Sequence, residues 1–347
     1  LCFASRARWQ GQIVDRCLVR ANDHALIRGR HVPAGPVLRP ADGPTSTIEH
    51  NDEARQVFVH GAEAVSHPRT DTRITHARLS RVHHEERGRM IVRLRPARVD
   101  KGHLVQKQRV AGSVTSKTLQ LLEGLVKEKT TKSLKELNAI AEEFIVSNGC
   151  TPTFKNYHGF PAGVCISVNE QVVHGIPLDR ILQEGDVVSF DLGSTFEGVV
   201  ADSALTCIFG EPKDERHVAL VDACEESLAL AIRAMRLNSR LGVIGSAIYK
   251  HGKSKGFTVI TAYGGHGIDM GENQQQIPHA SPFVSNKANF NEGIRIQQGL
   301  TIAIEPLLTL AETDETSIHS DKWTICCKDV SAHNEHTIFV RSDGVEV

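Results

Sequence analysis

The sequence predicts an α/β protein in which a pair of helices followed by a group of strands occurs twice. Two regions, about 114–145 and 214–251, carry apolar residues at the spacing of amphipathic helices. Each region is followed by runs rich in β-branched and aromatic residues, which indicate strands. Because the same order occurs twice, we expect two similar halves. With 40% hydrophobic residues in 347, the chain can bury a sizeable core as one or two domains.

The first pair of helices is expected to begin near Ala111, where a scattered pattern gives way to a regular one. The second helix of this pair has its own start and stop signals. Ser133 to Glu136 form a capping box, and Gly149 stands where a C-terminal cap belongs. The apolar stripes of the two helices consist of Val114, Leu119, Leu121, Leu122, Leu125 and Val126, and of Leu134, Leu137, Ile140, Ala141, Phe144 and Ile145.

A β-hairpin is expected after these helices. Its strands are the β-rich runs 187–192 and 199–206, and a loop from Gly193 to Gly198 joins them. The elements expected after the hairpin are, in order, a long helix over about 214–235, a shorter helix over about 243–251, and strands around 300–307, 323–326 and 335–340.

The charge of the chain is divided unevenly. Its formal net charge is −1, but residues 1–110 carry 18 Arg and 2 Lys against 11 acidic residues, a net charge of +9, and residues 111–347 carry a net charge of −10. Residues 1–110 also show little periodicity. We interpret them as an Arg- and His-rich segment that is disordered, or that precedes a natural start near Met90, or that forms a small domain. Residues 111–347 are expected to be the functional domain.

Several classes of protein are disfavoured. No run approaches the roughly 18 apolar residues of a membrane-spanning helix, and the first residues lack the apolar core of a signal peptide. The eight cysteines include no Cys-x-x-Cys pair, so neither a disulfide framework nor a zinc knuckle is expected. Arginine without interleaved aromatic residues is a weak signal for a nucleic-acid partner, so none is expected. These features favour a cytoplasmic protein with no membrane association.

Acidic residues stand inside or beside apolar strand runs at four positions. Asp191 and Asp202 each follow an apolar run of the expected hairpin, and Glu305 and Glu335 lie in or next to later strands. An ionised carboxylate in a buried strand is costly unless a cation or hydrogen bonds compensate it. His266 lies between two glycines, which we expect to let the backbone approach a ligand closely.

These four carboxylates and one imidazole form an oxygen-rich set of candidate metal ligands. No thiolate accompanies them, so moderately hard divalent ions such as Mn, Fe(II) or Co fit better than a structural zinc. Two such ions about 3.5–4 Å apart can bind one water and lower its pKa towards neutrality. The expected cofactor is therefore a pair of divalent metal ions. Any single acid is explained equally well as a satisfied buried polar group, but the set together is not.

Specific segments carry a resemblance to a known family, and they extend over residues 111–347. They are the segments 157–170 (YHGFPAGVCISVNE), 172–177 (VVHGIP), 265–268 (GHGI), 304–306 (IEP) and 334–337 (NEHT), together with two aspartates 11 residues apart. In these segments the chain resembles the type I methionine aminopeptidases. The resemblance implies the pita-bread fold, a curved antiparallel sheet with helices on its outer face and a dinuclear metal site in its centre.

The resemblance also implies a role for each matching residue. Asp191 chelates one ion, Asp202 and Glu335 bridge both ions, and His266 and Glu305 complete the second site. The ions, drawn from Co, Mn, Fe(II) or Zn, activate a water that attacks the carbonyl carbon after the first methionine. Glu305 is the expected proton shuttle to the leaving amine.

Further residues are implied to contact the substrate. His174 hydrogen-bonds the substrate near the scissile amide. His279 best matches a histidine that steadies the developing oxyanion, although the stretch between it and His266 is longer than the family pattern. The pocket for the methionine side chain consists of Tyr157, Phe160, Cys165 and Trp323.

The implied function is removal of the N-terminal initiator methionine from nascent proteins, with a small second residue preferred. The implied substrates are the N-termini of nascent polypeptides, and we expect transient contact with the ribosome and a monomeric enzyme. One alternative is an X-Pro aminopeptidase or prolidase-like member of the same fold, although Leu307 and Leu308 replace the Gly and Tyr that we associate with that branch. The other is a non-catalytic binding protein with this fold, which would typically have lost metal ligands.

Overall fold

The computed structural model describes residues 101–271 and 273–347, so the interpretation of residues 1–100 lies outside the described residues. The helices are α1 (Lys101–Lys127), α2 (Leu134–Ser147), α3 (Glu215–Ala234) and α4 (Gly242–Ser254), with a 3₁₀ turn at Tyr157–Gly159. The strands are β1 (Thr151–Pro152), β2 (Val164–Val168), β3 (Gln171–Val173), β4 (Val187–Phe196), β5 (Val199–Ile208), β6 (Thr258–Val259), β7 (Gly264–Met270), β8 (Gln276–Ser285), β9 (Thr301–Ile304), β10 (Leu307–Thr309), β11 (Ser317–Ile318), β12 (Ile325–Cys326), β13 (Ser331–His333), β14 (Glu335–Val340) and β15 (Val345–Glu346).

The main sheet of the described residues is antiparallel, in the order β1-β4-β5-β14-β9-β7-β8, with β2 paired to β4 and β15 paired to β14. The sheet curls, because its two ends approach one another. The backbone N–H of Gln276, the first residue of edge strand β8, donates to the carbonyl of Gly198 in the β4–β5 turn at 2.7 Å. The predicted α/β class and curved antiparallel sheet are confirmed.

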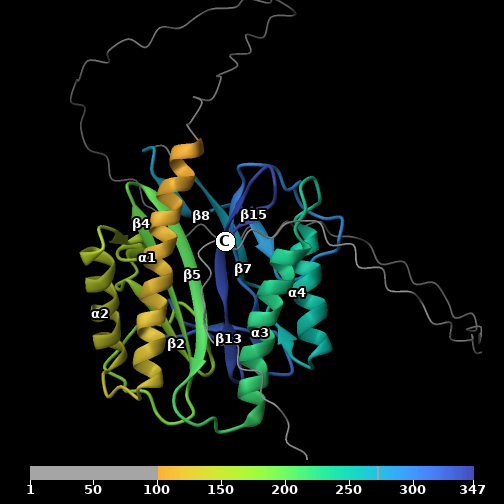
Figure 1. Cartoon of the computed structure of the whole chain (residues 1–347). Helices are drawn as coiled ribbons and strands as arrows, with labels where there is room; N and C mark the ends of the chain where they lie inside the picture. The colour runs from red at the N-terminus through yellow and green to blue at the C-terminus, as the bar shows by residue number, and fades with distance from the viewer. Residues whose placement is uncertain (1–100, 272) are drawn as a thin grey trace, which may run out of the picture. The chain divides into compact units, whose positions relative to one another are not determined.

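Two helix pairs cover the two halves of this sheet, as Figure 1 shows with α1 and α2 beside β4 and β5, and with α3 and α4 over the other half. Each pair has its own apolar cluster. One cluster joins α1 and α2 to β2 and β4, and the other joins α3 and α4 to β9 and β14. The expectation of two similar halves is therefore met by two separate cores under one sheet.

Helix α1 begins at Lys101, ten residues before the start we expected at Ala111. The apolar pattern misled us because polar residues occupy part of the buried face. Gln108, Thr115 and Thr118 are all buried. The side-chain amide of Gln108 donates to the carbonyl of Val200, and this bond offsets the cost of burying the amide. Gln108 therefore continues the buried face of α1 before Ala111, at a position where the apolar residues of that face end.

The signals for α2 are confirmed. Ser133 Oγ accepts from the N–H of Glu136, and the Glu136 carboxylate accepts from the N–H of Ser133 at 2.8 Å. Gly149 adopts φ +77°, the left-handed conformation that follows many helix C-termini. The longer helix α3 and the shorter helix α4 also lie where the sequence predicts them.

The β4–β5 hairpin is confirmed, but its loop is much shorter than we predicted. Both strands continue to a two-residue turn at Glu197 and Gly198. We interpreted Gly193 as the start of the loop, whereas it pairs with Asp202 inside the ladder. A side chain there would collide with Thr153, so this glycine makes room for a neighbouring chain segment.

Two other predicted strands are shorter than expected. The run 300–307 is divided between β9 and β10, because Pro306 has no N–H to donate to a ladder. The run 323–326 retains only β12, since the Asp321 carboxylate accepts from the backbone N–H of both Trp323 and Thr324 and holds them in a turn. Strand β14 is confirmed and starts at Glu335 itself.

None of the helices in the described part of the chain has both the length and the apolar character that a membrane crossing requires.

Candidate metal centre and active site

The alternation of the strands places three acidic residues on the face of the sheet opposite the helices. In β4, Val188, Phe190 and Leu192 pack under α1 and α2, so Asp191 points the other way. In β14, Ile338 belongs to the core under α3 and α4, and Glu335 has the opposite parity. The strand register brings these residues together, because Ala204, two residues after Asp202 in β5, lies opposite both Asp191 and Glu335.

Five residues converge on the inner face of the sheet. His266 Nε2 lies 3.8 Å from Asp202 Oδ2, 3.8 Å from Glu305 Oε1 and 3.6 Å from Glu335 Oε1. Three sets of three residues each hold their nearest ligand atoms within 4.8 Å of one another. They are Asp191, Asp202 and Glu335; His266, Glu305 and Glu335; and Asp202, His266 and His279. Glu335 belongs to the first two sets, which is the arrangement that two adjacent cations with a shared ligand would need.

The carboxylates of this cluster fit metal ions because they have too few other partners. Asp191 Oδ1, Asp202 Oδ1 and Glu335 Oε1 are buried and make no hydrogen bond within residues 101–271 and 273–347. Burial and the charges of the neighbouring acids raise the pKa of Asp191 and of Glu335 well above their ordinary values. Burial likewise raises the pKa of Glu305 to about 7, although His266 opposes the shift. Divalent cations would replace both the missing partners and the missing positive charge.

Residues 106–342 match the model of metallopeptidase family M24. The chain belongs to this family. A methionine aminopeptidase of Mycoplasma capricolum is 42% identical over 245 residues, which cover 70% of this chain and 94% of that relative. Methionine aminopeptidase 1 of Mycobacterium tuberculosis is 38% identical over 272 residues, covering 75% of this chain and 96% of the relative. The crystal structure of methionine aminopeptidase from Thermotoga maritima superposes with a TM-score of 0.65 at 31% identity, covering 74% of this chain and 98% of that one.

These likenesses confirm the predicted family and its pita-bread fold. Membership of the M24 metallopeptidase family also implies the use of divalent metal, and the five clustered side chains are candidate ligands for it, with His279 beside them. Whether each of them ligates an ion, and how many ions bind, stays a prediction.

The glycines beside His266 have a different purpose from the one we expected. A side chain at Gly265 would collide with the carbonyl of Ala303 in β9, and one at Gly267 would collide with the carbonyl of Ser281 in β8. The space is therefore filled by neighbouring strands, and no ligand is needed to explain it. The glycines allow β7 to lie close between β9 and β8, and this packing positions the imidazole of His266 in the M24 cluster.

His279 lies close to His266 in spite of the long stretch between them. That stretch forms the β7–β8 hairpin, which returns the chain so that the two imidazole rings are 4.4 Å apart between centroids. His174 has φ +58°, an unusual conformation for a residue with a side chain. Burial lowers the pKa of His174 to about 4, so its imidazole is neutral near pH 7. The catalytic roles of both histidines stay predictions.

Three of the four residues predicted to hold the methionine side chain lie in one apolar cluster. Phe160, Cys165 and Trp323 pack together, and the rings of Phe160 and Trp323 meet edge to face at 5.3 Å. Cys165 lies opposite Asp191 in the β2–β4 ladder, so this cluster adjoins the acidic one. Tyr157 lies outside the apolar cluster and packs its ring against His279 at 5.4 Å.

A polar clamp holds the loop that carries this cluster. Asn138 Oδ1 accepts from the backbone N–H of both Gly163 and Val164 at 3.0 Å, and Glu142 Oε1 accepts from Gly163 at 2.9 Å. We assigned Asn138 no role from the sequence. It ties α2 to the segment between Phe160 and β2.

His333 is a residue of the site that sequence reasoning missed. It is 2% exposed, and its Nε2 lies 3.5 Å from Glu305 Oε2 and 4.0 Å from Glu335 Oε2, without a hydrogen bond in the described structure. Burial lowers its pKa to about 3, so the ring is neutral. The signal was available in the sequence, since residues two apart in an extended chain face the same side and Glu335 was already a candidate.

Proposed function

We propose that this protein removes the N-terminal methionine from nascent polypeptides in the cytoplasm, as a metallo-aminopeptidase with two divalent ions. The observation that carries the proposal is the pair of ligand sets that share Glu335 among buried, unpartnered carboxylate oxygens. Asp191 would hold one ion, Asp202 and Glu335 would be shared, and His266 and Glu305 would complete the second site. When bound, the ions would polarise the scissile carbonyl and lower the pKa of a water.

The protein's own side chains would then complete the hydrolysis. The oxygen of water adds to the carbonyl carbon of the methionine, and Glu305 takes the proton that this oxygen loses. Glu305 suits this task because its carboxylate lies within the cluster, with Oε1 3.8 Å from His266 Nε2, and a carboxylate positioned beside the reacting atoms can carry a proton. It passes the proton to the nitrogen of the second residue, so that the C–N bond breaks and a free amine leaves.

Neutral histidines would stabilise the charge that develops in this reaction. His279 lies beside His266 and can donate an N–H to the oxyanion. His174 is neutral near pH 7, so its N–H can hydrogen-bond the substrate next to the scissile amide without repelling a cation. The apolar cluster of Phe160, Cys165 and Trp323 would bury the unbranched methionine side chain.

The proposal also includes the substrate preference, the oligomeric state, the ribosome contact and the metal. A small second residue is preferred, because the substrate passes close to the sheet near His174. The enzyme acts as a monomer and contacts the ribosome transiently where nascent chains emerge. We identify the physiological ion only as one of Co, Mn, Fe(II) or Zn, because an oxygen-rich site accepts several and supply decides among them.

The test is cleavage of the peptide Met-Ala-Ser by the full chain. Chelator should abolish the reaction, and titration with Mn²⁺ or Co²⁺ should restore it. Folded protein that remains inactive with every divalent ion would overturn the proposal, and the absence of bound metal would indicate a binding protein. An Ala-Pro peptide distinguishes the X-Pro alternative, because we expect Met-Ala to be cleaved and Ala-Pro to be left intact.

A further inference from the structure

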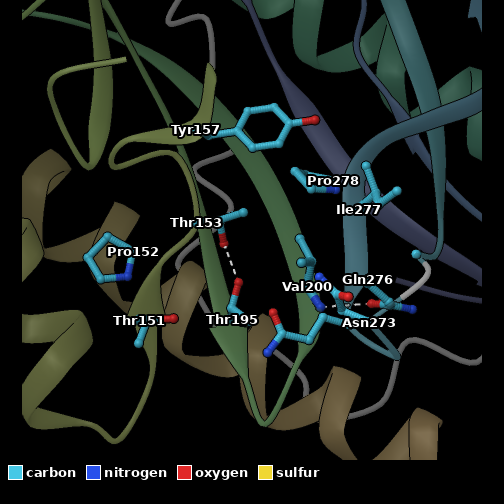
Figure 2. A pocket seen from close by; sticks show the side chains of 12 residues that line it. Thr151, Pro152, Thr153, Tyr157, Thr195, Val200, Asn273, Gln276, Ile277 and Pro278 are labelled. Atoms are coloured by element: carbon cyan, nitrogen blue, oxygen red, sulfur yellow. Dashed lines mark hydrogen bonds between the residues drawn. The ribbon is translucent and has the colours of Figure 1, made fainter. Parts of the chain in front are cut away.

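A groove of about 350 Å³ lies beside the site, between the edges of the curled sheet. Figure 2 shows its lining. Thr153 and Thr195 lie on one side, with their hydroxyls joined at 2.8 Å, and Gln276, Ile277 and Pro278 of β8 lie on the other. The volume is at the small end of the range of roughly 300–1,000 Å³ typical of ligand pockets, so the groove suits a short peptide segment.

The groove continues directly from the catalytic residues. Tyr157 lines it, and the ring of Tyr157 packs against His279, which in turn lies against His266. The phenol of Tyr157 points towards Pro278 across the inner end of the groove (Figure 2). A substrate chain that passes His279 would therefore reach the groove next.

The same face of the sheet forms the floor of both the acidic cluster and the groove. Asp191 and Thr195 are four residues apart in β4 and therefore share a face, and Asp202 and Val200 share a face in β5. Between the two ends of this track, Gly193 has no side chain and Thr153 packs over it. The floor is thus continuous from the acidic cluster to the groove.

The length of this track indicates which part of a substrate occupies the groove. Four residues of a strand span about 13 Å, and an extended peptide advances at the same rise of about 3.3 Å per residue. With the carbonyl of residue 1 at the acidic cluster, the fourth and fifth residues of a substrate fall beside Thr195.

The chemistry of the lining suits a peptide of any sequence. All of the described side chains that line the groove are uncharged, and they offer hydroxyl and amide groups. The Gln276 Oε1 accepts from the N–H of Val200 at 2.7 Å, whereas its Nε2 donates to no other residue in 101–271 or 273–347. Asn273 and Gln275 are exposed at the tip of the β7–β8 hairpin. Neutral amides and hydroxyls can pair with peptide groups, which every substrate carries.

We propose that this groove is a binding site for the fourth and fifth residues of the substrate, recognised through their backbone. The proposal rests on the aminopeptidase activity proposed above. It assigns a second role to the long β7–β8 hairpin. This hairpin brings His279 back to the site, and it also forms one wall of the groove that the substrate occupies beyond the site.

The experiment adds a charge to the described lining of the groove. Gln275→Glu and Gln275→Lys place either charge at the exposed rim, and Gln120→Glu and Gln120→Lys make the same changes on the exposed outer surface of α1 as matched controls. The full chain, loaded with Mn²⁺, is assayed with three C-terminally amidated peptides: Met-Ala-Ser, Met-Ala-Ser-Lys-Lys and Met-Ala-Ser-Glu-Glu. Asn273→Glu and Asn273→Lys provide a second pair at the same rim.

The reference is the ratio of kcat/KM that the wild-type protein shows for the two charged peptides. Gln275→Glu should favour the Lys peptide over the Glu peptide by about two- to fivefold, the size expected for one exposed charge pair, and Gln275→Lys should reverse the preference. The change should lie in KM. The Gln120 variants should show no such preference.

The inference is overturned if the Gln275 and Asn273 variants treat both charged peptides alike, or if the Gln120 variants discriminate equally, since net charge would then explain the effect. Cleavage of Met-Ala-Ser by the wild-type protein separates the two proposals. If Met-Ala-Ser is cleaved and no charge preference develops, only the groove is wrong, whereas metal-loaded protein that cleaves no peptide contradicts the proposed function and the groove together.

Discussion

The buried carboxylate of Asp186, which precedes β4, and the carboxylate cluster of the candidate metal centre have sharply different surroundings. Asp186, just before β4, is 2% exposed and has partners on every side. It accepts from Asn169 at 3.0 Å, from Arg180 at 2.9 Å and from the backbone of Gln183 at 3.0 Å, and Lys213 lies at 3.3 Å. Burial alone would raise the pKa of Asp186, but these hydrogen bonds lower it below its ordinary value.

The acids of the candidate metal centre are buried to a similar degree and lack such partners. Asp202 is 1% exposed and Glu335 is 2% exposed, and each has a buried oxygen without a hydrogen bond in the described structure. Their nearest charged neighbours include one another. Burial therefore does not by itself indicate function. A buried acid with partners stabilises the fold, whereas a cluster of buried acids without partners indicates a place for a cation.

The largest expected effect comes from removing one acid of each kind. Asp202→Asn should lower kcat/KM for Met-Ala-Ser by more than about a hundredfold, because even residues behind metal ligands contribute about 10–100-fold. The same change should leave the stability of metal-free protein unchanged or higher, since it removes a repelling charge. Asp186→Asn should show the reverse, with near-normal kcat and a loss of about 1–3 kcal/mol in the free energy of unfolding. Peptide kinetics and urea unfolding in chelator measure both.

The comparison fails if the two variants behave alike. A severe loss of stability in metal-free Asp202→Asn would indicate that this carboxylate holds the fold together, as Asp186 does. Full activity in Asp202→Asn would remove it from the metal centre.

The next effect concerns His333, which connects the acidic cluster to the protein behind it. Its backbone is fixed by Thr206, whose hydroxyl donates to the carbonyl of His333 at 2.6 Å and accepts from its N–H at 2.9 Å. His333→Leu removes the imidazole whose Nε2 lies 3.5 Å from Glu305 Oε2. The kcat should therefore fall about 10–100-fold, with little change in KM. His333→Gln, which keeps an N–H donor, should recover part of the loss. An unchanged kcat in the Leu variant would mean that His333 is only a buried core residue.

The smallest effect is the dependence of metal-free stability on pH. Glu305 and Asp202 have pKa values raised to about 7 and about 6 in the folded state. Their protonated forms are favoured by folding, so this contribution is complete below the unfolded pKa of about 4 and is lost as the pH rises through about 6–7. Asp186 acts in the opposite sense, because its lowered pKa contributes stability that is lost as the pH falls.

Urea unfolding in chelator, compared with a double variant that carries Asp202→Asn and Glu305→Gln, isolates the two site acids. The wild type should lose more stability than the double variant between about pH 5 and pH 8. Mn²⁺ should cancel that loss, since metal ligation favours the deprotonated acids. Equal pH dependence in both proteins would show that these acids do not titrate as the cluster requires.

The fold was predictable where local signals are strong. The capping box at Ser133 and the acids inside the apolar runs of β4 and β5 are readable in the sequence, because each depends on a few adjacent residues. The start of α1 was missed because Gln108, which precedes the predicted start, satisfies its side-chain amide through a long-range contact with Val200. Strand β8 contains Pro278 and Pro282, which argue against a strand locally, yet it lies at an edge of the sheet where proline is tolerated.

The site was predicted less evenly, because some of its features depend on contacts between segments that are far apart in the sequence. The five candidate ligands were found through a resemblance and through the cost of burying an acid. His333 was overlooked although it stands two residues from Glu335, and its approach to Glu305 is visible only in the fold. The glycines beside His266 could not be interpreted correctly without knowing which strands pack against them.

The most direct test of the central claim is calorimetric titration of the metal-free full chain with Mn²⁺, followed by the peptide assay. If the unpartnered acids form one dinuclear site, about two ions should bind per chain, protons should be released on binding below about pH 7, and cleavage of Met-Ala-Ser should develop with the bound metal. Binding should be lost in Asp202→Asn and retained in Asp186→Asn. Folded protein that binds no divalent ion, or that binds it equally in Asp202→Asn, would contradict the account.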